Sequence, residues 1–113
     1  MARLLAETAG TMPPLKGIVH AAVVIDDGLA RSATPEQIER TLAAKVLGAQ
    51  HLHELTRALP LDLFIFYSSA TTLFGNPGQS NYVAANAWLE CLAAQRRAEG
   101  LPATCVRWGA IDD

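Results

Sequence analysis

Five side chains able to donate protons or hydrogen bonds stand where a single ligand could reach them. Ser68 and Ser69 follow an apolar run, and Tyr82 and Asn86 are four residues apart, which places the latter two on one face of a helix. Lys45 is one of only two lysines in the chain. An ammonium beside a phenol favours the ionised form of that phenol. Hydroxyl, phenol, amide and ammonium groups together suit chemistry at one carbonyl oxygen.

Three short apolar runs predict the strands that position these groups, over residues 16–24, 61–67 and 103–108. Each run is nearly continuous rather than alternating, which is typical of strands buried on both faces of a parallel sheet. Ligands bind beyond the carboxyl ends of such strands. Ser68 and Ser69 stand at that end of the second strand.

The first connecting helix is predicted to start after Thr34. That residue is the expected N-cap, with Pro35 at the first helical position and Gln37 at the capping-box position. Leu59-Pro60 is expected to end the helix. Its buried stripe should consist of apolar residues at three- and four-residue steps, namely Ile38, Leu42, Val46, Ala49 and Leu52.

The second connecting helix is predicted over residues 79–99, with Gly100 and Pro102 as its stop signals. Its expected inward side consists of Val83, Asn86, Ala87, Cys91 and Ala94. Residues 3–10 are predicted to be the tail of a preceding helix.

The resulting fold class is α/β, a parallel sheet in β-α-β-α-β order with right-handed crossovers. None of the strands is followed by a G-x-G-x-x-G turn. The chain is therefore predicted to be one partial Rossmann-like domain over residues 1–113 that lacks the N-terminal dinucleotide-binding half.

Composition excludes several classes of protein. The chain has 113 residues, of which 50% are hydrophobic and 18% charged, so it is not a disordered linker. Its net charge of −2 provides no basic footprint for nucleic acid. No apolar run is long enough to span a membrane. The two cysteines lack C-x-x-C spacing, which favours a reduced, cytoplasmic setting. No metal site is expected, because no second His, Cys or carboxylate stands at metal-ligand spacing from His20.

Beyond these patterns, residues 15–109 resemble the ketoreductase domain of modular polyketide synthases, within the short-chain dehydrogenase/reductase superfamily. The similarity lies in an ordered set of motifs rather than in one signature. These motifs are Gly17-Ile-Val-His-Ala-Ala22, Val24-Ile-Asp-Asp-Gly28, Lys45-Val-Leu-Gly-Ala49, Phe66-Tyr-Ser-Ser69, Asn76-Pro-Gly-Gln-Ser-Asn-Tyr82 with Asn86, and Arg107-Trp-Gly109.

The resemblance implies a catalytic role for each of four residues. Tyr82 would protonate the β-keto oxygen, and Ser69, thirteen residues earlier, would hydrogen-bond the same oxygen. Lys45 would favour the phenolate and contact the nicotinamide ribose, and Asn86 would hold a water chain that resupplies the proton. Ordinary superfamily members have the lysine four residues after the tyrosine. An asparagine at that position, with the lysine on the preceding helix, is the polyketide-type arrangement.

The resemblance further implies NADPH as cofactor and a β-ketoacyl thioester on an acyl carrier protein as substrate. The carrier protein and the rest of a synthase module would be the partners. Val23 departs from the family, which commonly has glycine there, and the family's phosphate-binding turn has no counterpart in the chain. The residues implied to bind the cofactor are His20, Ala21, Ala22, Lys45, Trp108 and Gly109.

Stereochemical markers of the family favour a B-type enzyme that forms a D-configured hydroxyl. Phe74 stands where A-type members have tryptophan, and Ala84 replaces the proline linked to epimerising B-type members. The expected product is therefore not epimerised at the α-carbon. The residues implied to contact substrate are Asp26, Asp27, Pro77 and Asn81.

Each of these residues taken alone has a simpler structural interpretation, such as a strand-end hydroxyl, a packing aromatic or a surface lysine. Only their joint spacing favours the enzyme. An alternative hypothesis is a non-catalytic remnant or interaction fragment of a synthase. A stand-alone carrier-protein reductase is disfavoured because such enzymes normally keep the lysine four residues after the tyrosine. Without the phosphate-binding half, the isolated chain is expected to be inactive.

Overall fold

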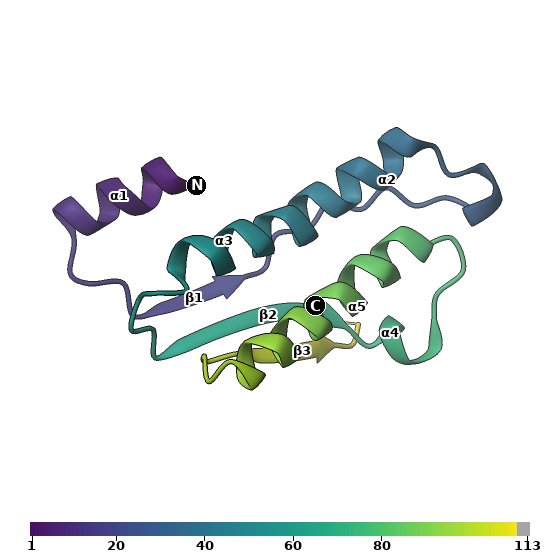
Figure 1. Cartoon of the computed structure of the whole chain (residues 1–113). Coiled ribbons are helices and arrows are strands. Elements are labelled where there is room, and N and C mark those ends of the chain that lie inside the picture. Colours follow the sequence, from purple (N-terminus) through teal and green to yellow (C-terminus); the bar gives the residue numbers. More distant parts are fainter. Residues whose placement is uncertain (111–113) are drawn as a thin grey trace.

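The computed structural model describes residues 1–110, and residues 111–113 lie outside the description. It contains a three-stranded parallel sheet with strands in the chain order β1 (Gly17–His20), β2 (Leu63–Ser69) and β3 (Thr104–Trp108). Figure 1 shows the strands side by side, with a helical connection following each of the first two. The predicted α/β class and β-α-β-α-β order are therefore confirmed.

The first connection is one long helical rod of three segments. These are α2 (Pro35–Leu42), a π-helical turn η2 (Ala43–Leu47) and α3 (Gly48–Thr56). A short 3₁₀ turn, η1 (Ala30–Ser32), precedes them. The capping box is confirmed, because Thr34 and Gln37 exchange both hydrogen bonds. The rod ends at Thr56, slightly before the predicted stop.

The second connection contains the short helix α4 (Thr71–Phe74) and the long helix α5 (Ser80–Ala98). Gly100 ends α5 as predicted: it has φ 76°, and the amide of Leu101 donates to the carbonyl of Arg96. The N-terminal helix α1 (Ala2–Thr11) confirms the predicted preceding helix and has no buried residue.

The core lies between one face of the sheet and the two helical connections. Ile18, Phe64 and Phe66 from the strands pack against Ala49 of α3 and Leu89 of α5. The prediction that the strands are buried on both faces is wrong for the described residues. Val19 and Leu63, which point to the opposite face, are 55% and 43% exposed.

The predicted inward stripes of both helices need correction. On the first rod, Ile38 is exposed, and the buried positions are Thr41, Lys45, Ala49, His53 and Thr56. Their mainly four-residue spacing follows from the wider π turn, which rotates the chain less per residue than an α-helix.

On α5 the buried residues are Ala85, Asn86, Leu89, Leu92, Ala93 and Arg96, whereas Ala87, Cys91 and Ala94 are exposed. Alanines occur on every side of α5 and carry little directional information. The bulky leucines decide which face is buried.

The first strand is shorter than predicted, because pairing between β1 and β2 ends at His20 and Phe66. The apolar residues beyond it leave the sheet. Val23 and Ile25 instead line a cavity at the carboxyl ends of the strands.

Candidate functional site

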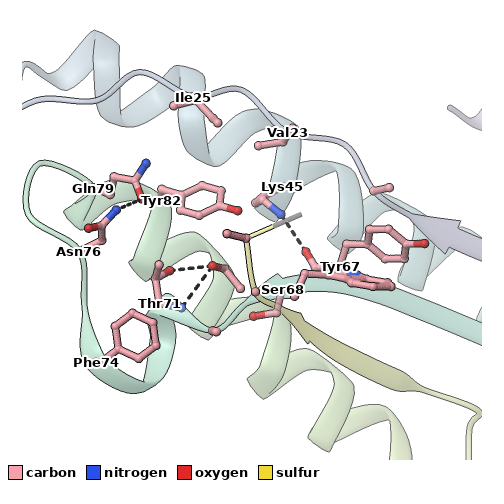
Figure 2. Close-up of a pocket in the computed structure, with 16 residues that line it drawn as sticks. Val23, Ile25, Lys45, Tyr67, Ser68, Thr71, Phe74, Asn76, Gln79 and Tyr82 are labelled. Carbon is pink, nitrogen blue, oxygen red and sulfur yellow. Dashed lines mark hydrogen bonds between the residues drawn. The ribbon is translucent and has the colours of Figure 1, made fainter. Parts of the chain in front are cut away.

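An open cavity of about 590 Å³ lies at the carboxyl ends of all three strands, where parallel sheets bind ligands. Figure 2 shows it bordered by the chain after β1, the first helical rod, the β2–α5 connection and the start of α5. Its lining residues are Ala21, Val23, Ile25, Lys45, Tyr67, Ser68, Ser69, Ala70, Thr71, Phe74, Asn76, Gln79, Tyr82, Trp108, Gly109 and Ala110.

Lys45 reaches the cavity wall from the π turn and is only 3% exposed. Its ammonium donates to the backbone carbonyl of Tyr67 at 2.8 Å and lies 5.5 Å from the ring centroid of Tyr82. Figure 2 shows the two side chains directed toward each other. Burial lowers the pKa of Lys45 below its ordinary value of 10.5, because low polarity disfavours the charged form.

His20 lies beneath Lys45 rather than in the cavity. Its Nε2 is 2.9 Å from the carbonyl oxygen of Lys45, to which the ring N–H donates. Burial and the neighbouring ammonium lower the pKa of His20, against the opposing effect of this hydrogen bond. Gly48 leaves room for the ring, since a Cβ there would lie 3.2 Å from His20 Cε1. The contact therefore fixes the backbone of the turn that carries Lys45.

Tyr82 lines the cavity from the first turn of α5, and Asn86 lies buried one turn later. The Asn86 amide donates through Nδ2 to the Tyr82 carbonyl at 2.9 Å. Its Oδ1 is buried and accepts from no described residue. A buried amide oxygen without a protein partner suits an ordered water.

Ser69 lines the cavity from the last position of β2 and is 7% exposed. Its Oγ accepts from the Thr71 backbone N–H at 3.2 Å and from the Thr71 hydroxyl at 2.9 Å. Both contacts are drawn in Figure 2. The adjacent Thr72 hydroxyl donates to the Ser69 carbonyl at 3.0 Å, so this strand end is held by both threonines.

Glu90, which sequence reasoning missed, anchors the same strand end from beneath. Its carboxylate accepts from Ser68 Oγ at 2.7 Å and Thr72 Oγ1 at 2.8 Å, and it pairs with Arg107. The Arg107 contact is the main reason that the pKa of Glu90 falls to about 2, with the two hydroxyls adding to it. The available signal was spacing, because Glu90 lies one helical turn after Asn86.

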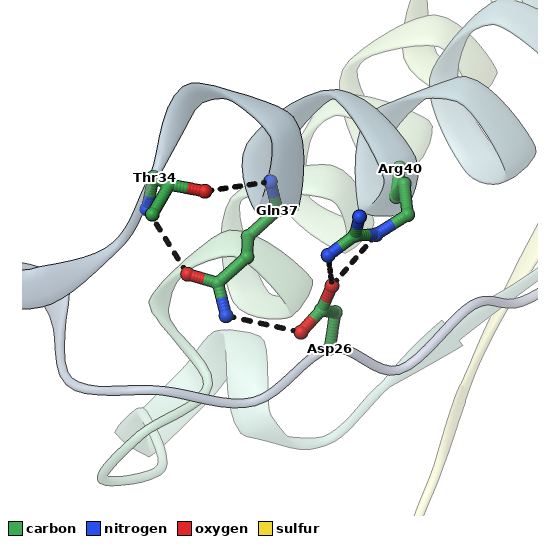
Figure 3. Close-up of polar contacts among 4 residues, drawn as sticks. All are labelled: Asp26, Thr34, Gln37 and Arg40. Atoms are coloured by element: carbon green, nitrogen blue, oxygen red, sulfur yellow. Dashed lines mark hydrogen bonds and ion pairs between the residues drawn. The ribbon is translucent and has the colours of Figure 1, made fainter.

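The two aspartates predicted to contact substrate, Asp26 and Asp27, hydrogen-bond to neighbouring segments of the chain. Figure 3 shows Asp26 accepting from Gln37 at 3.1 Å and paired with Arg40, both on α2. Asp27 accepts from Gln79 Nε2 at 2.9 Å, and Gln79 in turn accepts from Asn76 at 2.7 Å. The Asp26-Asp27 turn therefore links α2 to the segment that leads into Tyr82.

The cavity brings together Lys45, Ser69 and Tyr82 of the four predicted catalytic residues. Of the residues predicted to contact cofactor, Ala21, Trp108 and Gly109 also line it. Seven predicted residues lie outside the lining, namely His20, Ala22, Asp26, Asp27, Pro77, Asn81 and Asn86. Sequence reasoning did not single out Thr71, Asn76 or Gln79 as site residues.

Within residues 1–110, no three His, Cys, Asp or Glu side chains are grouped so that they could hold a metal ion. The same residues include no helix whose length and apolar character would let it cross a membrane.

Comparison with known proteins assigns the chain to a family. The KR domain model matches residues 1–113. Polyketide synthase GfsA of Streptomyces halstedii is 55% identical over 98 residues, covering 87% of this chain and 1% of that protein. The phthioceranic/hydroxyphthioceranic acid synthase of Mycobacterium bovis is 49% identical over 111 residues, covering 98% of this chain and 5% of the synthase.

Solved structures show the same relationship. An A-type ketoreductase from a modular polyketide synthase superposes with a TM-score of 0.92 at 40% identity, covering 100% of this chain and 25% of that one. The first ketoreductase of the tylosin synthase gives 0.88 at 44% identity, with coverages of 98% and 24%. The chain thus spans about a quarter of each solved structure.

Proposed function

Because this chain belongs to the KR-domain family, we propose that the polypeptide carrying it reduces the β-ketone of an acyl thioester to a hydroxyl. The observation that supports this proposal most is the meeting of Lys45, Ser69 and Tyr82 around one cavity. They come from three separate elements, the π turn, β2 and α5. An ammonium, a hydroxyl and a phenol around one space suit a ketone oxygen that gains negative charge.

In this proposal Tyr82 is the general acid that gives its phenolic proton to the ketone oxygen. Ser69 donates a hydrogen bond to the same oxygen, which strengthens as negative charge develops there. Lys45 lies against the Tyr82 ring, where its positive charge favours the phenolate left after proton transfer. Asn86 Oδ1, which accepts from no described residue, holds a water that returns a proton to Tyr82.

The cavity residues fit a nicotinamide cofactor, proposed to be NADPH. An ammonium has three N–H donors, and the described residues accept from Lys45 only at Tyr67, so donors remain for the ribose hydroxyls. Ala21, Trp108 and Gly109 would line the nicotinamide. The bound cofactor would supply the hydride. The chain has no G-x-G-x-x-G turn, so the pyrophosphate would be held by residues outside it.

The substrate is proposed to arrive on the phosphopantetheine arm of an acyl carrier protein within a synthase module. A B-type, D-configured hydroxyl is proposed from Asp26, Asp27, Pro77 and Asn81. The contacts of Asp26 and Asp27 support an indirect effect on substrate orientation, because Asp27 bonds Gln79, which lines the cavity. Two similar solved structures are described as A-type and A1-type ketoreductases, so overall similarity does not decide the stereochemical type.

The proposal is tested by incubating the natural polypeptide that contains these residues with a small β-ketoacyl thioester and NADPH or NADH. We expect one molecule of cofactor to be oxidised for each β-hydroxyacyl thioester formed, and the reaction to be faster with NADPH than with NADH. Chiral chromatography should identify the product as the D enantiomer. If the folded polypeptide forms no β-hydroxyacyl thioester, the proposed enzymatic activity is wrong and the alternative hypothesis of a non-catalytic interaction fragment is favoured. The L product would contradict only the stereochemical assignment.

A further inference from the structure

The hydrogen bonds around Ser69 bear on how its hydroxyl is directed. A serine hydroxyl has two acceptor lone pairs and one donor hydrogen. Both contacts to Ser69 Oγ come from Thr71, one from the backbone N–H and one from the hydroxyl. With its two lone pairs occupied, Ser69 retains only its O–H for a further hydrogen bond, and the residue lines the cavity.

From this geometry we infer that Thr71 is a positioning residue, whose hydroxyl holds Ser69 as a hydrogen-bond donor to the ketone oxygen. The inference rests on the proposed function, because it concerns the same oxygen. A hydroxyl that accepts a hydrogen bond becomes a stronger donor. The Thr71 hydroxyl therefore both fixes the rotation of Ser69 Oγ–H and strengthens the bond that Ser69 gives.

The surrounding contacts hold this pair in place. Thr71 begins α4 one residue after the strand end, and the single hydroxyl hydrogen of Thr72 is shared between the Ser69 carbonyl and the Glu90 carboxylate. The backbone at positions 69–72 is thus anchored independently of the Thr71 hydroxyl. Removing that hydroxyl should leave the fold intact and free the Ser69 hydroxyl to rotate.

The test compares Thr71→Val with Thr71→Ser in the natural polypeptide, using β-ketoacyl thioester reduction. Valine keeps the shape and the backbone N–H but lacks the hydroxyl, so we expect kcat to fall about 3- to 10-fold. The KM values for thioester and nicotinamide should stay within about twofold, because the Ser69 bond strengthens in the transition state. Serine should restore kcat to within about twofold of the native value.

A double-mutant cycle with Ser69→Ala separates positioning from structural damage. In the Ser69→Ala background, Thr71→Val should change kcat by less than about twofold, because the group it directs is gone. The control Thr104→Val, at an exposed threonine of β3, should keep native kcat. If the valine variant is unfolded by circular dichroism, Thr71→Ala removes the same hydroxyl and carries the same expectations.

Two results would overturn the inference alone. In the first, Thr71→Val lowers kcat by the same factor in the Ser69→Ala background as in the native protein. In the second, Thr71→Ser has a kcat as low as that of Thr71→Val. By contrast, a native polypeptide without reductase activity, or a Ser69→Ala variant with native kcat, would overturn the proposed function itself and the inference with it.

Discussion

At the scale of single residues, the site depends on a buried cation that the fold must support. Lys45 is 3% exposed, and its ammonium donates to one backbone carbonyl, that of Tyr67. The His20 ring holds the carbonyl of Lys45 itself, and Gly48 makes room for that ring. His20, Gly48 and Tyr67 therefore all help to fix the direction of the Lys45 side chain.

This arrangement predicts an unusual outcome for Gly48→Ala. Replacing glycine by alanine inside a helix normally stabilises it by up to about 1 kcal/mol. At position 48 the new Cβ would lie 3.2 Å from His20 Cε1, so the ring must shift and its bond to Lys45 weakens. We expect no gain in the midpoint of thermal unfolding and a lower kcat for ketone reduction.

Gly10→Ala is the matched control, because Gly10 is helical and a Cβ there meets nothing within 4 Å. The Gly10→Ala variant should be as stable as the native protein or more stable, and its activity should be native. A Gly48→Ala variant that is more stable than Gly10→Ala and fully active would show that His20 does not constrain Lys45.

At the scale of secondary-structure elements, Glu90 connects the parts that form the cavity floor. From α5 it contacts Ser68 of β2, Thr72 of α4 and Arg107 of β3. Arg107 ensures that this carboxylate stays ionised when the protein is folded. Hydrophobic patterning detects none of this, because the network consists of polar side chains whose meeting depends on the register of β2 with β3.

The Glu90 network predicts a specific loss of stability in acid. Its pKa in the folded protein is about 2, against an ordinary value of 4.5. The unfolded chain therefore binds the proton first, so the stabilisation is complete above pH 4.5 and is lost as the pH falls toward 2. At pH 7, the free energy of unfolding measured in urea should be lower for Glu90→Gln than for the native protein. Between pH 4.5 and 3, it should change less for the variant than for the native protein.

Glu39→Gln serves as the control, because Glu39 is exposed on α2 and outside the network. It should keep the native pH dependence over this range. Equal pH dependence of the native protein and Glu90→Gln would disprove the proposed role of the Glu90 carboxylate.

At the scale of the whole molecule, sequence patterns predicted the order of the helices and strands better than they predicted which faces of those elements are buried. The capping box at Thr34 and the Gly100 stop are local signals, and both are confirmed. The inward faces of the helices were largely wrong, because a π turn changes the helical phase and because α5 has alanine on all sides. Neither effect can be found from hydrophobic periodicity.

The sheet illustrates the same limit. Its strands have apolar side chains on both faces, yet residues 1–110 cover only one, leaving Val19 and Leu63 exposed. A sequence pattern indicates which environment a residue suits, and not which segment supplies it. Sequence motifs predicted the site residues Lys45, Ser69 and Tyr82. By contrast, Thr71 and Glu90 became evident only through their contacts with Ser69 and Ser68.

Tyr82→Phe in the natural polypeptide tests most directly whether Tyr82 is the acid that protonates the ketone. Phenylalanine keeps the ring beside Lys45 and removes only the hydroxyl. Because general acid catalysis is worth about 10²–10⁴-fold, we predict that kcat for β-ketoacyl thioester reduction falls at least about 10²-fold, with the Kd for nicotinamide within about twofold. A Tyr82→Phe variant whose kcat stays within about tenfold of the native value would show that Tyr82 is not the acid.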